Sequence, residues 1–156
     1  MANRHVDAHA NCIETVNHPK IKVSDPGTGQ AAILQNPDRK PVRRIKMDQC
    51  LAPVNSIAAD WIVSKSTIVD VIVELKGADV PHAVDQIEAT LRFWLRHAAY
   101  ENGQQIGAWI LCSEYPRASS KVAHYRERFR ARGRILVIST HNGEERQFTD
   151  FLPRNR

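Results

Sequence analysis

The sequence has few cysteines and no long apolar run. Its three cysteines, Cys12, Cys50 and Cys112, are widely spaced, and there is no Cys-x-x-Cys pair of the kind that holds structural zinc. An odd number of scattered cysteines is more typical of a reducing compartment than of a disulfide framework. No stretch approaches the roughly 20 apolar residues that a membrane-spanning helix needs, and residues 1–7 lack the apolar core of a signal peptide. We therefore expect a cytoplasmic protein that does not bind a membrane.

The charged residues are distributed unevenly along the chain. The 156 residues, 42% of them hydrophobic, carry a net charge of +5, which is ordinary for one globular domain. Residues 117–134 contain seven basic residues against one acid, Glu127, and so have a net charge of +6. Such a segment predicts a polyanion partner such as nucleic acid, and a solvated helix face is the simpler alternative. The candidate phosphate-binding residues are Lys121, Arg126, Arg128, Arg130 and Arg132.

Hydrophobic periodicity and turn residues predict an α/β domain over residues 1–145, followed by a flexible tail over 146–156. Asp79 is the expected N-cap of a long helix, because Pro81 and an apolar stripe from Val84 to Ala98 follow it. The expected elements, in chain order, are a helix at 6–16, a hairpin of 21–23 with 31–34, strands at 42–51, 60–64 and 68–76, a helix at 80–100, a strand at 106–112, the basic helix at 119–132 and a strand at 134–139.

Residues 60–76 are the most informative segment. Val69, Val71, Val73 and Leu75 alternate with side chains that include three charges, so one face of this strand is apolar and the other is charged. If the strand pairs with residues 60–64 and the apolar faces match, Asp60 lies opposite Glu74. A two-residue turn would shift this register by one residue and mix the faces, so we expect an odd-length or bulged connection.

In this register Asp60 and Glu74 point into one concavity, and Lys76 follows two residues later on the same face. Two carboxylates are ligands that Mg²⁺ accepts, with water and phosphate oxygen in its other sites. Such an ion activates water and offsets negative charge on a phosphate, and a lysine can orient the water. The arrangement suits hydrolysis of a phosphodiester bond.

These residues resemble the PD-(D/E)XK nuclease superfamily, in which an acid on one strand precedes Glu-x-Lys on the next within a core of helix, three strands, helix and strand. Asp60 corresponds to the first acid and Glu74-Leu75-Lys76 to the Glu-x-Lys, and Ala59 stands where the family name has proline. The resemblance covers residues 42–113, with 6–16 as the possible first helix. It implies a restriction-endonuclease-like fold, with a central mixed sheet flanked by helices, and cleavage of DNA with Mg²⁺ or Mn²⁺.

The resemblance also assigns roles to individual residues. Asp60, Glu74 and the Leu75 carbonyl would hold the metal, and Lys76 would assist the attacking water. Glu14 would be the acid that many members direct from the first helix to the metal, or else a solvated glutamate. Gln86 matches a helix position where several members carry a glutamine beside the active site, so we count it with Asp60, Glu74 and Lys76 as a catalytic candidate. Asp70, nearer the hairpin turn, is expected to have a structural role.

Two other functions fit the same sequence. Some members of the superfamily keep the fold and the acids but serve as nucleic-acid-binding or structural subunits, so this chain could bind DNA without cleaving it, as a homodimer or with a partner subunit. A small interaction or immunity-type protein would instead use the basic helix to contact an acidic protein. Cleavage of DNA and the salt dependence of DNA binding distinguish these cases.

Overall fold

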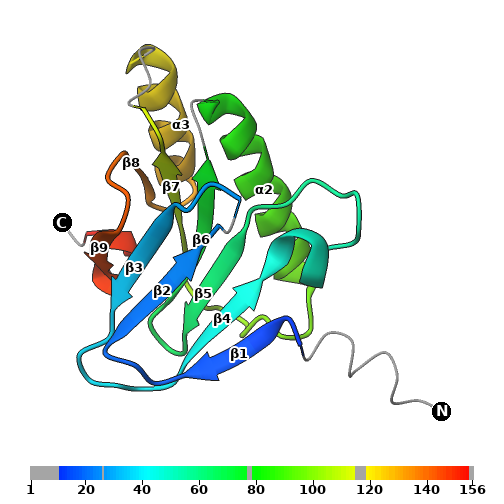
Figure 1. Cartoon of the computed structure of the whole chain (residues 1–156). Helices are drawn as coiled ribbons and strands as arrows, with labels where there is room; N and C mark the ends of the chain where they lie inside the picture. Colours follow the sequence, from blue (N-terminus) through cyan, green and yellow to red (C-terminus); the bar gives the residue numbers. More distant parts are fainter. Residues whose placement is uncertain (1–10, 26, 77–78, 115–118, 155–156) are drawn as a thin grey trace.

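The computed structural model describes residues 11–25, 27–76, 79–114 and 119–154. Its centre is a six-stranded mixed sheet of order β1-β4-β5-β6-β7-β8 (Figure 1). The strands are β1 (Ile13–Val16), β4 (Val42–Lys46), β5 (Trp61–Lys65), β6 (Val69–Lys76), β7 (Ile106–Cys112) and β8 (Leu136–Ser139). β1, β4, β5 and β6 pair antiparallel, whereas β7 and β8 continue parallel to β6. The fold is therefore α/β with a mixed sheet.

The pairing of β5 with β6 is the one that the apolar alternation predicts. Trp61 pairs with Val73 and Val63 with Val71. Three residues, 66–68, connect the strands, with Thr67 at a φ of +66° and a hydrogen bond of 3.0 Å from the Ile68 N–H to the Lys65 carbonyl. The expected odd-length connection is thus confirmed, and it keeps Asp60 on the same face as Glu74.

Two helices cover one face of this sheet. α2 (Val80–Arg96) begins where expected, with the Asp79 side chain accepting a hydrogen bond from the His82 N–H at 3.1 Å. It ends at Arg96, earlier than the predicted residue 100. α3 (Ser119–Ala131) buries Val122 and Phe129 beside it. α2 contacts β6 and β7, α3 contacts β8, and both helices share one buried cluster with Ile62, Ile72, Ile110 and Ile138 of the sheet.

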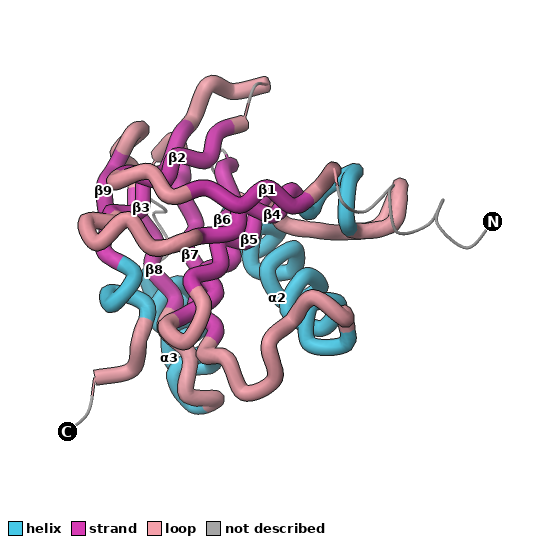
Figure 2. The backbone as a smooth tube through the Cα atoms, turned by 90° about the horizontal axis from the view of Figure 1, so that it is seen from below, coloured by secondary structure: helices cyan, strands magenta, loops and turns pink. Residues whose placement is uncertain are grey.

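A small second sheet covers the other face. It contains β2 (Lys20–Ser24), β3 (Ala31–Gln35) and β9 (Glu144–Gln147), in the order β2-β3-β9. β2 and β3 form the predicted antiparallel hairpin. Ile21, Val23 and Leu34 pack on the apolar side of β5 and β6, together with Trp109 of β7. Figure 2 shows α2 and α3 on one side of the large sheet and β2 and β3 on the other.

The predicted N-terminal helix is wrong over its described part. Residues 13–16 form β1, an edge strand in which Ile13 pairs with Ile45 and Val16 with Val42; residues 1–10 lie outside the described residues. The predicted strand 42–51 is correct to Lys46 and then turns into the irregular helical segment η1 (Met47–Leu51), where Gln49 has a φ of +56°. Met47 and Leu51 are buried in the core under α2, which an extended continuation of β4 would not achieve.

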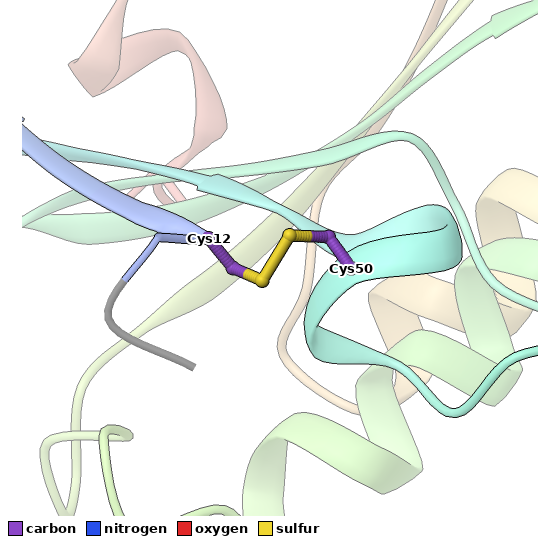
Figure 3. The surroundings of a disulfide bond; sticks show 2 residues. All are labelled: Cys12 and Cys50. Carbon is purple, nitrogen blue, oxygen red and sulfur yellow. A yellow bond between two sulfur atoms is a disulfide. The ribbon is translucent and has the colours of Figure 1, made fainter. Parts of the chain in front are cut away.

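Two of the cysteines form a disulfide. Cys12, immediately before β1, is bonded to Cys50 in η1, and their Cα atoms are 5.7 Å apart (Figure 3). Cys112 is a buried free thiol. The expectation that the cysteines do not form disulfides is therefore corrected, because β1 and η1 both lie next to β4 and bring Cys12 to Cys50.

The C-terminal residues are not a flexible tail as far as residue 151. β9 pairs parallel with β3, and the short helix η2 (Phe148–Phe151) follows it. Phe148 and Phe151 are 4% and 0% exposed and complete the core between the two sheets. In the described part of the chain no helix is both long and apolar enough to cross a bilayer.

Candidate active site

Asp60 and Glu74 meet at the start of β5. Asp60 precedes the Trp61–Val73 pair by one residue and therefore lies opposite Glu74. One oxygen of Asp60, Oδ2, accepts a hydrogen bond from the Leu75 backbone N–H at 2.9 Å, and the Asp60 and Glu74 carboxyl groups are hydrogen-bonded to each other. Two carboxyl groups at such close range disfavour ionisation of both, because like charges repel.

Burial dominates the electrostatics of this pair. Glu74 is 1% exposed, and desolvation of Asp60 raises the pKa of its carboxyl above the ordinary value. The Asp25 and Asp48 carboxylates raise this pKa further, whereas the hydrogen bonds with Glu74 and Leu75 lower it. Among the side chains that the structure describes, acids therefore outnumber cations at this site, an imbalance that a bound cation would relieve.

Asp60 lies in the wall of a cavity of about 160 Å³ that opens to solvent. Lys46 and Trp61 line it together with the acids Asp25, Asp48 and Asp60, so three carboxyl groups face one ammonium. Asp25 comes from the β2–β3 turn and Asp48 from η1, and the sequence pattern marked neither of them as a site residue. Their contribution could not be predicted, because it depends on how the hairpin and η1 fold over the end of β5.

The Leu75 carbonyl also faces this site. The N–H and C=O of one residue in a strand point to the same side, and the Leu75 N–H is bonded to Asp60. Two carboxylates and a carbonyl are the hard oxygen ligands that Mg²⁺ takes while keeping several waters. Within residues 11–25, 27–76, 79–114 and 119–154, no cluster of three or more His, Cys, Asp or Glu side chains could hold a metal ion. The fit of a divalent cation thus depends on this pair and this carbonyl.

The other two predicted catalytic residues are Lys76 and Gln86. Lys76 ends β6, where its backbone pairs with Cys112, and its side chain lies outside the part of the chain that the structure describes. Gln86 of α2 donates a hydrogen bond from Nε2 to the Ala58 carbonyl at 3.1 Å. Because Ala58 lies two residues before Asp60, this contact makes Gln86 a support for the segment that carries the acid.

Thr90, one turn further along α2, supports the same segment. Its Oγ1 accepts a hydrogen bond from the Ala59 N–H at 2.7 Å, and Thr90 and Ala59 are 1% and 0% exposed. The sequence contained a signal for this contact, because Thr90 is a polar residue on the apolar stripe of the helix. Gln86 and Thr90 together fix the backbone immediately before Asp60.

Glu14 is not brought to the acid pair. It lies in β1, with its side chain 60% exposed, and its Oε2 is 2.6 Å from a guanidinium nitrogen of Arg44. The hydrogen bond and the charge of Arg44 lower the pKa of Glu14. Glu14 pairs with Arg44 and Arg44 with Val63, three residues from Asp60, so Glu14 lies on the opposite face of the sheet.

Asp70 has the structural role that its position suggested. It is fully buried and accepts hydrogen bonds from the Trp94 indole N–H at 2.8 Å and from Gln104 Nε2 at 3.4 Å. Desolvation raises the pKa of its carboxyl, while these bonds and one with Ser64 lower it. Asp70 thus joins β6 to α2, away from the acid pair.

The basic helix α3 places most of its cations in solvent. Val122 and Phe129 are buried and Tyr125 is partly buried. Arg128 is the exception among the cations, because it forms an ion pair with Glu88 of α2 and lies 5.3 Å from the Tyr125 ring centre. The remaining candidate phosphate ligands are exposed: Lys121, Arg126, Arg130 and Arg132.

α3 also lies on the same side of the large sheet as the acid pair. Glu74 alternates with Val73 and Leu75, which face the second sheet, and so points to the side that α2 and α3 cover. A polyanion that contacts α3 would therefore approach the molecule from the side of the acid pair.

Comparison with protein-family models, with curated proteins and with solved structures gave no significant match for this chain.

Proposed function

We propose that the protein is a metal-dependent nuclease of the PD-(D/E)XK type, which hydrolyses phosphodiester bonds in DNA. The element order supports a restriction-endonuclease-like core, because the antiparallel strands β4, β5 and β6 are followed by α2 and then by the parallel strand β7. The first helix of that core has no counterpart at residues 13–16, which form β1. The proposal therefore depends mainly on the site.

The observation that carries the proposal is the contact between Asp60 and Glu74. Two carboxyl groups held together in a largely buried position cost folding free energy, and a hydrophobic pair of similar size would pack there without that cost. The Leu75 carbonyl lies at the same edge of β6 as the Leu75 N–H and can supply a third oxygen ligand. A bound cation would offset the cost of burying the two acids.

In the proposed mechanism Asp60, Glu74 and the Leu75 carbonyl would hold Mg²⁺ or Mn²⁺. Such an ion, when bound, stabilises the negative charge that develops on the phosphate and favours ionisation of a water. Lys76, two residues after Glu74, would orient the attacking water by donating a hydrogen bond to its oxygen and would offset phosphate charge. Gln86 and Thr90 hold the backbone of residues 58–59, which keeps Asp60 opposite Glu74.

The DNA would lie along α3. Lys121, Arg126, Arg130 and Arg132 supply exposed cations, whereas Arg128 is committed to Glu88. Phosphate contacts of this kind give affinity without sequence preference. We therefore expect cleavage with little dependence on base sequence.

Nicking of supercoiled plasmid in the presence of Mg²⁺ tests the proposal. Glu74→Gln keeps the size of the side chain and can donate a hydrogen bond to Asp60, so the fold should persist while cleavage is lost. Lys76→Ala should also abolish cleavage and leave DNA affinity nearly unchanged. Glu145→Gln, which changes a carboxylate of β9 that pairs with Lys20, is the matched control and should cleave normally. Wild-type cleavage by Lys76→Ala would refute the mechanism.

A non-catalytic function is favoured by one feature of the surface. Val54 and Ile57 are 74% and 59% exposed on the loop that precedes Asp60, and neighbouring exposed aliphatic side chains are typical of a protein contact. The chain would then be a silent nuclease-fold subunit, acting as a homodimer or with a protein partner. In that case the plasmid stays intact, and Val54→Asp changes the mass measured by sedimentation.

A further inference from the structure

A second and larger cavity lies at the opposite end of β5. Its volume is about 580 Å³, within the range of about 300–1,000 Å³ typical of small-molecule sites. Three segments line it: the β3–β4 loop, the β5–β6 turn and the start of η2. β5 runs from Trp61, beside the acid pair, to Lys65 in the cavity wall, which separates the two sites by about 13 Å at 3.3 Å per residue.

The cavity is the place where the core between the two sheets opens to solvent. Pro37, Pro41, Ile68 and Phe148 supply apolar lining, and Phe148 belongs to the buried cluster behind it. An apolar recess with a few polar groups in its wall is the usual form of a ligand site.

The principal polar group in the wall is a buried cation. Lys65 is 8% exposed, and its ammonium donates to Asn36 Oδ1 and Asp38 Oδ1, both at 2.8 Å. It also lies 5.3 Å from the centre of the Phe148 ring. An ammonium has three N–H groups, and among the described residues it has two acceptors, so one N–H remains for a ligand.

The two acceptors of this ammonium, Asn36 and Asp38, differ in how firmly they are held. Asn36 is fully buried and is itself held by hydrogen bonds from its Nδ2 to the carbonyls of His18 and Lys40. The Asp38 side chain is 45% exposed, so water can solvate its carboxylate when it leaves Lys65. A competing anion can therefore displace Asp38 from Lys65 without disturbing Asn36.

We propose that this cavity binds a monoanionic apolar molecule, namely an aliphatic or aromatic carboxylate. The ligand should carry one negative charge, because two cations, Lys40 and Lys65, line the cavity with one acid, Asp38. It should be apolar because most of the wall is apolar. The anionic group takes the remaining N–H of Lys65 or the place of Asp38, and the apolar body covers Ile68 and Phe148. This site is separate from the acid pair and does not depend on the nuclease proposal.

Fluorescence titration with two dyes tests this proposal on the full chain. The anion 8-anilinonaphthalene-1-sulfonate should bind at one saturable site, at least tenfold more tightly than the uncharged N-phenyl-1-naphthylamine. Decanoate should displace the anionic dye at concentrations at least tenfold lower than decanol does. Equal affinities for the charged and uncharged dyes would overturn the proposal.

Variants locate the site. Ile68→Asp should weaken binding of the anionic dye at least tenfold, and Lys40→Glu should weaken the anionic but not the uncharged dye. Lys22→Glu makes the same charge change on the exposed side of β2, outside the cavity, and should leave binding unchanged. Binding that persists in Ile68→Asp, or that Lys22→Glu weakens as much as Lys40→Glu does, would show adventitious dye binding and refute the site.

Lys65→Met tests the buried cation itself and should abolish the preference for the anionic dye. This substitution leaves Asn36 Oδ1 without its donor, so circular dichroism must first show that the variant folds. If it unfolds, amide chemical shifts of the wild-type protein decide: decanoate should shift Ser66, Thr67 and Thr149 but not Trp61. Shifts at Trp61 alone would contradict the assignment.

Discussion

Replacing Thr90 by valine tests how α2 supports the acid pair. Valine has nearly the shape of threonine but cannot accept the hydrogen bond of the Ala59 N–H, which is then left buried without an acceptor. An unsatisfied buried donor costs about 1–3 kcal/mol of unfolding free energy. For a chain of this length each kcal/mol lowers the melting temperature by roughly 2–4 °C, so we expect a fall of about 2–12 °C.

The assay is thermal unfolding followed by circular dichroism, with plasmid nicking measured below the melting temperature. Thr90→Ser is the matched control, because it keeps the acceptor and loses one methyl group, worth about 0.8 kcal/mol. Ala59 directly precedes Asp60, so Thr90→Val should also slow nicking while Thr90→Ser does not. If Thr90→Val is as stable as wild type, Thr90 does not hold this segment.

Three further outcomes follow from the structure. Changing Arg126 and Arg130 to glutamine should flatten the slope of log affinity against log salt by about 1.8 for duplex DNA if both contact phosphate, and an unchanged slope would make α3 a solvated face. Reduction of the Cys12–Cys50 disulfide, which spans 38 residues, should lower the unfolding free energy by about 4 kcal/mol in a chain-entropy estimate, and denaturant unfolding with and without reductant checks this. Burial raises the pKa of Asp70 in the folded protein, so the stabilisation that Asp70 contributes is complete below about pH 4 and falls as pH rises through the folded-state pKa. Asp70→Asn should remove this loss of stability with rising pH. Identical profiles of stability against pH for wild type and Asp70→Asn would refute this prediction.

Strand register was the most predictable property of this sequence. The alternation of Val69, Val71 and Val73 with a face that carries Asp70 and Glu74 allows one pairing with β5 in which the apolar faces match, and the structure has that pairing. The same pairing brings Asp60 to Glu74, because the position of an acid opposite its partner follows from register alone. The local pattern of polarity was sufficient to predict strand pairing where the two faces of a strand differ strongly in polarity.

The errors occurred where tertiary contacts decide the local conformation. Ile13 and Val16 are three residues apart, a helical spacing, but they belong to an edge strand that pairs with β4. Phe148 and Phe151 lie among polar residues and still enter the core, because β9 pairs with β3 and delivers them there. The sequences of residues 13–16 and 144–147 do not themselves indicate that these segments pair with β4 and β3.

The disulfide also bears on the redox compartment in which the protein resides. Disulfides persist mainly in oxidising compartments, so the bond between Cys12 and Cys50 removes the cysteine argument for a cytoplasmic location. Titration of free thiols in freshly isolated protein, unfolded without reductant, measures this directly. One reactive thiol, that of Cys112, is the result consistent with the structure.

If Asp60 and Glu74 form the proposed cation site, Mn²⁺ should stabilise the fold, and the melting temperature measures this stabilisation. At a hundred times its dissociation constant a ligand adds about 2.7 kcal/mol of stability, which should raise the melting temperature of wild type by about 5–11 °C over protein in chelator. Glu74→Gln should show no rise, and Glu14→Gln should keep the wild-type rise because Glu14 lies on the other face of the sheet. An unchanged melting temperature in wild type, or an equal rise in Glu74→Gln, would contradict the account.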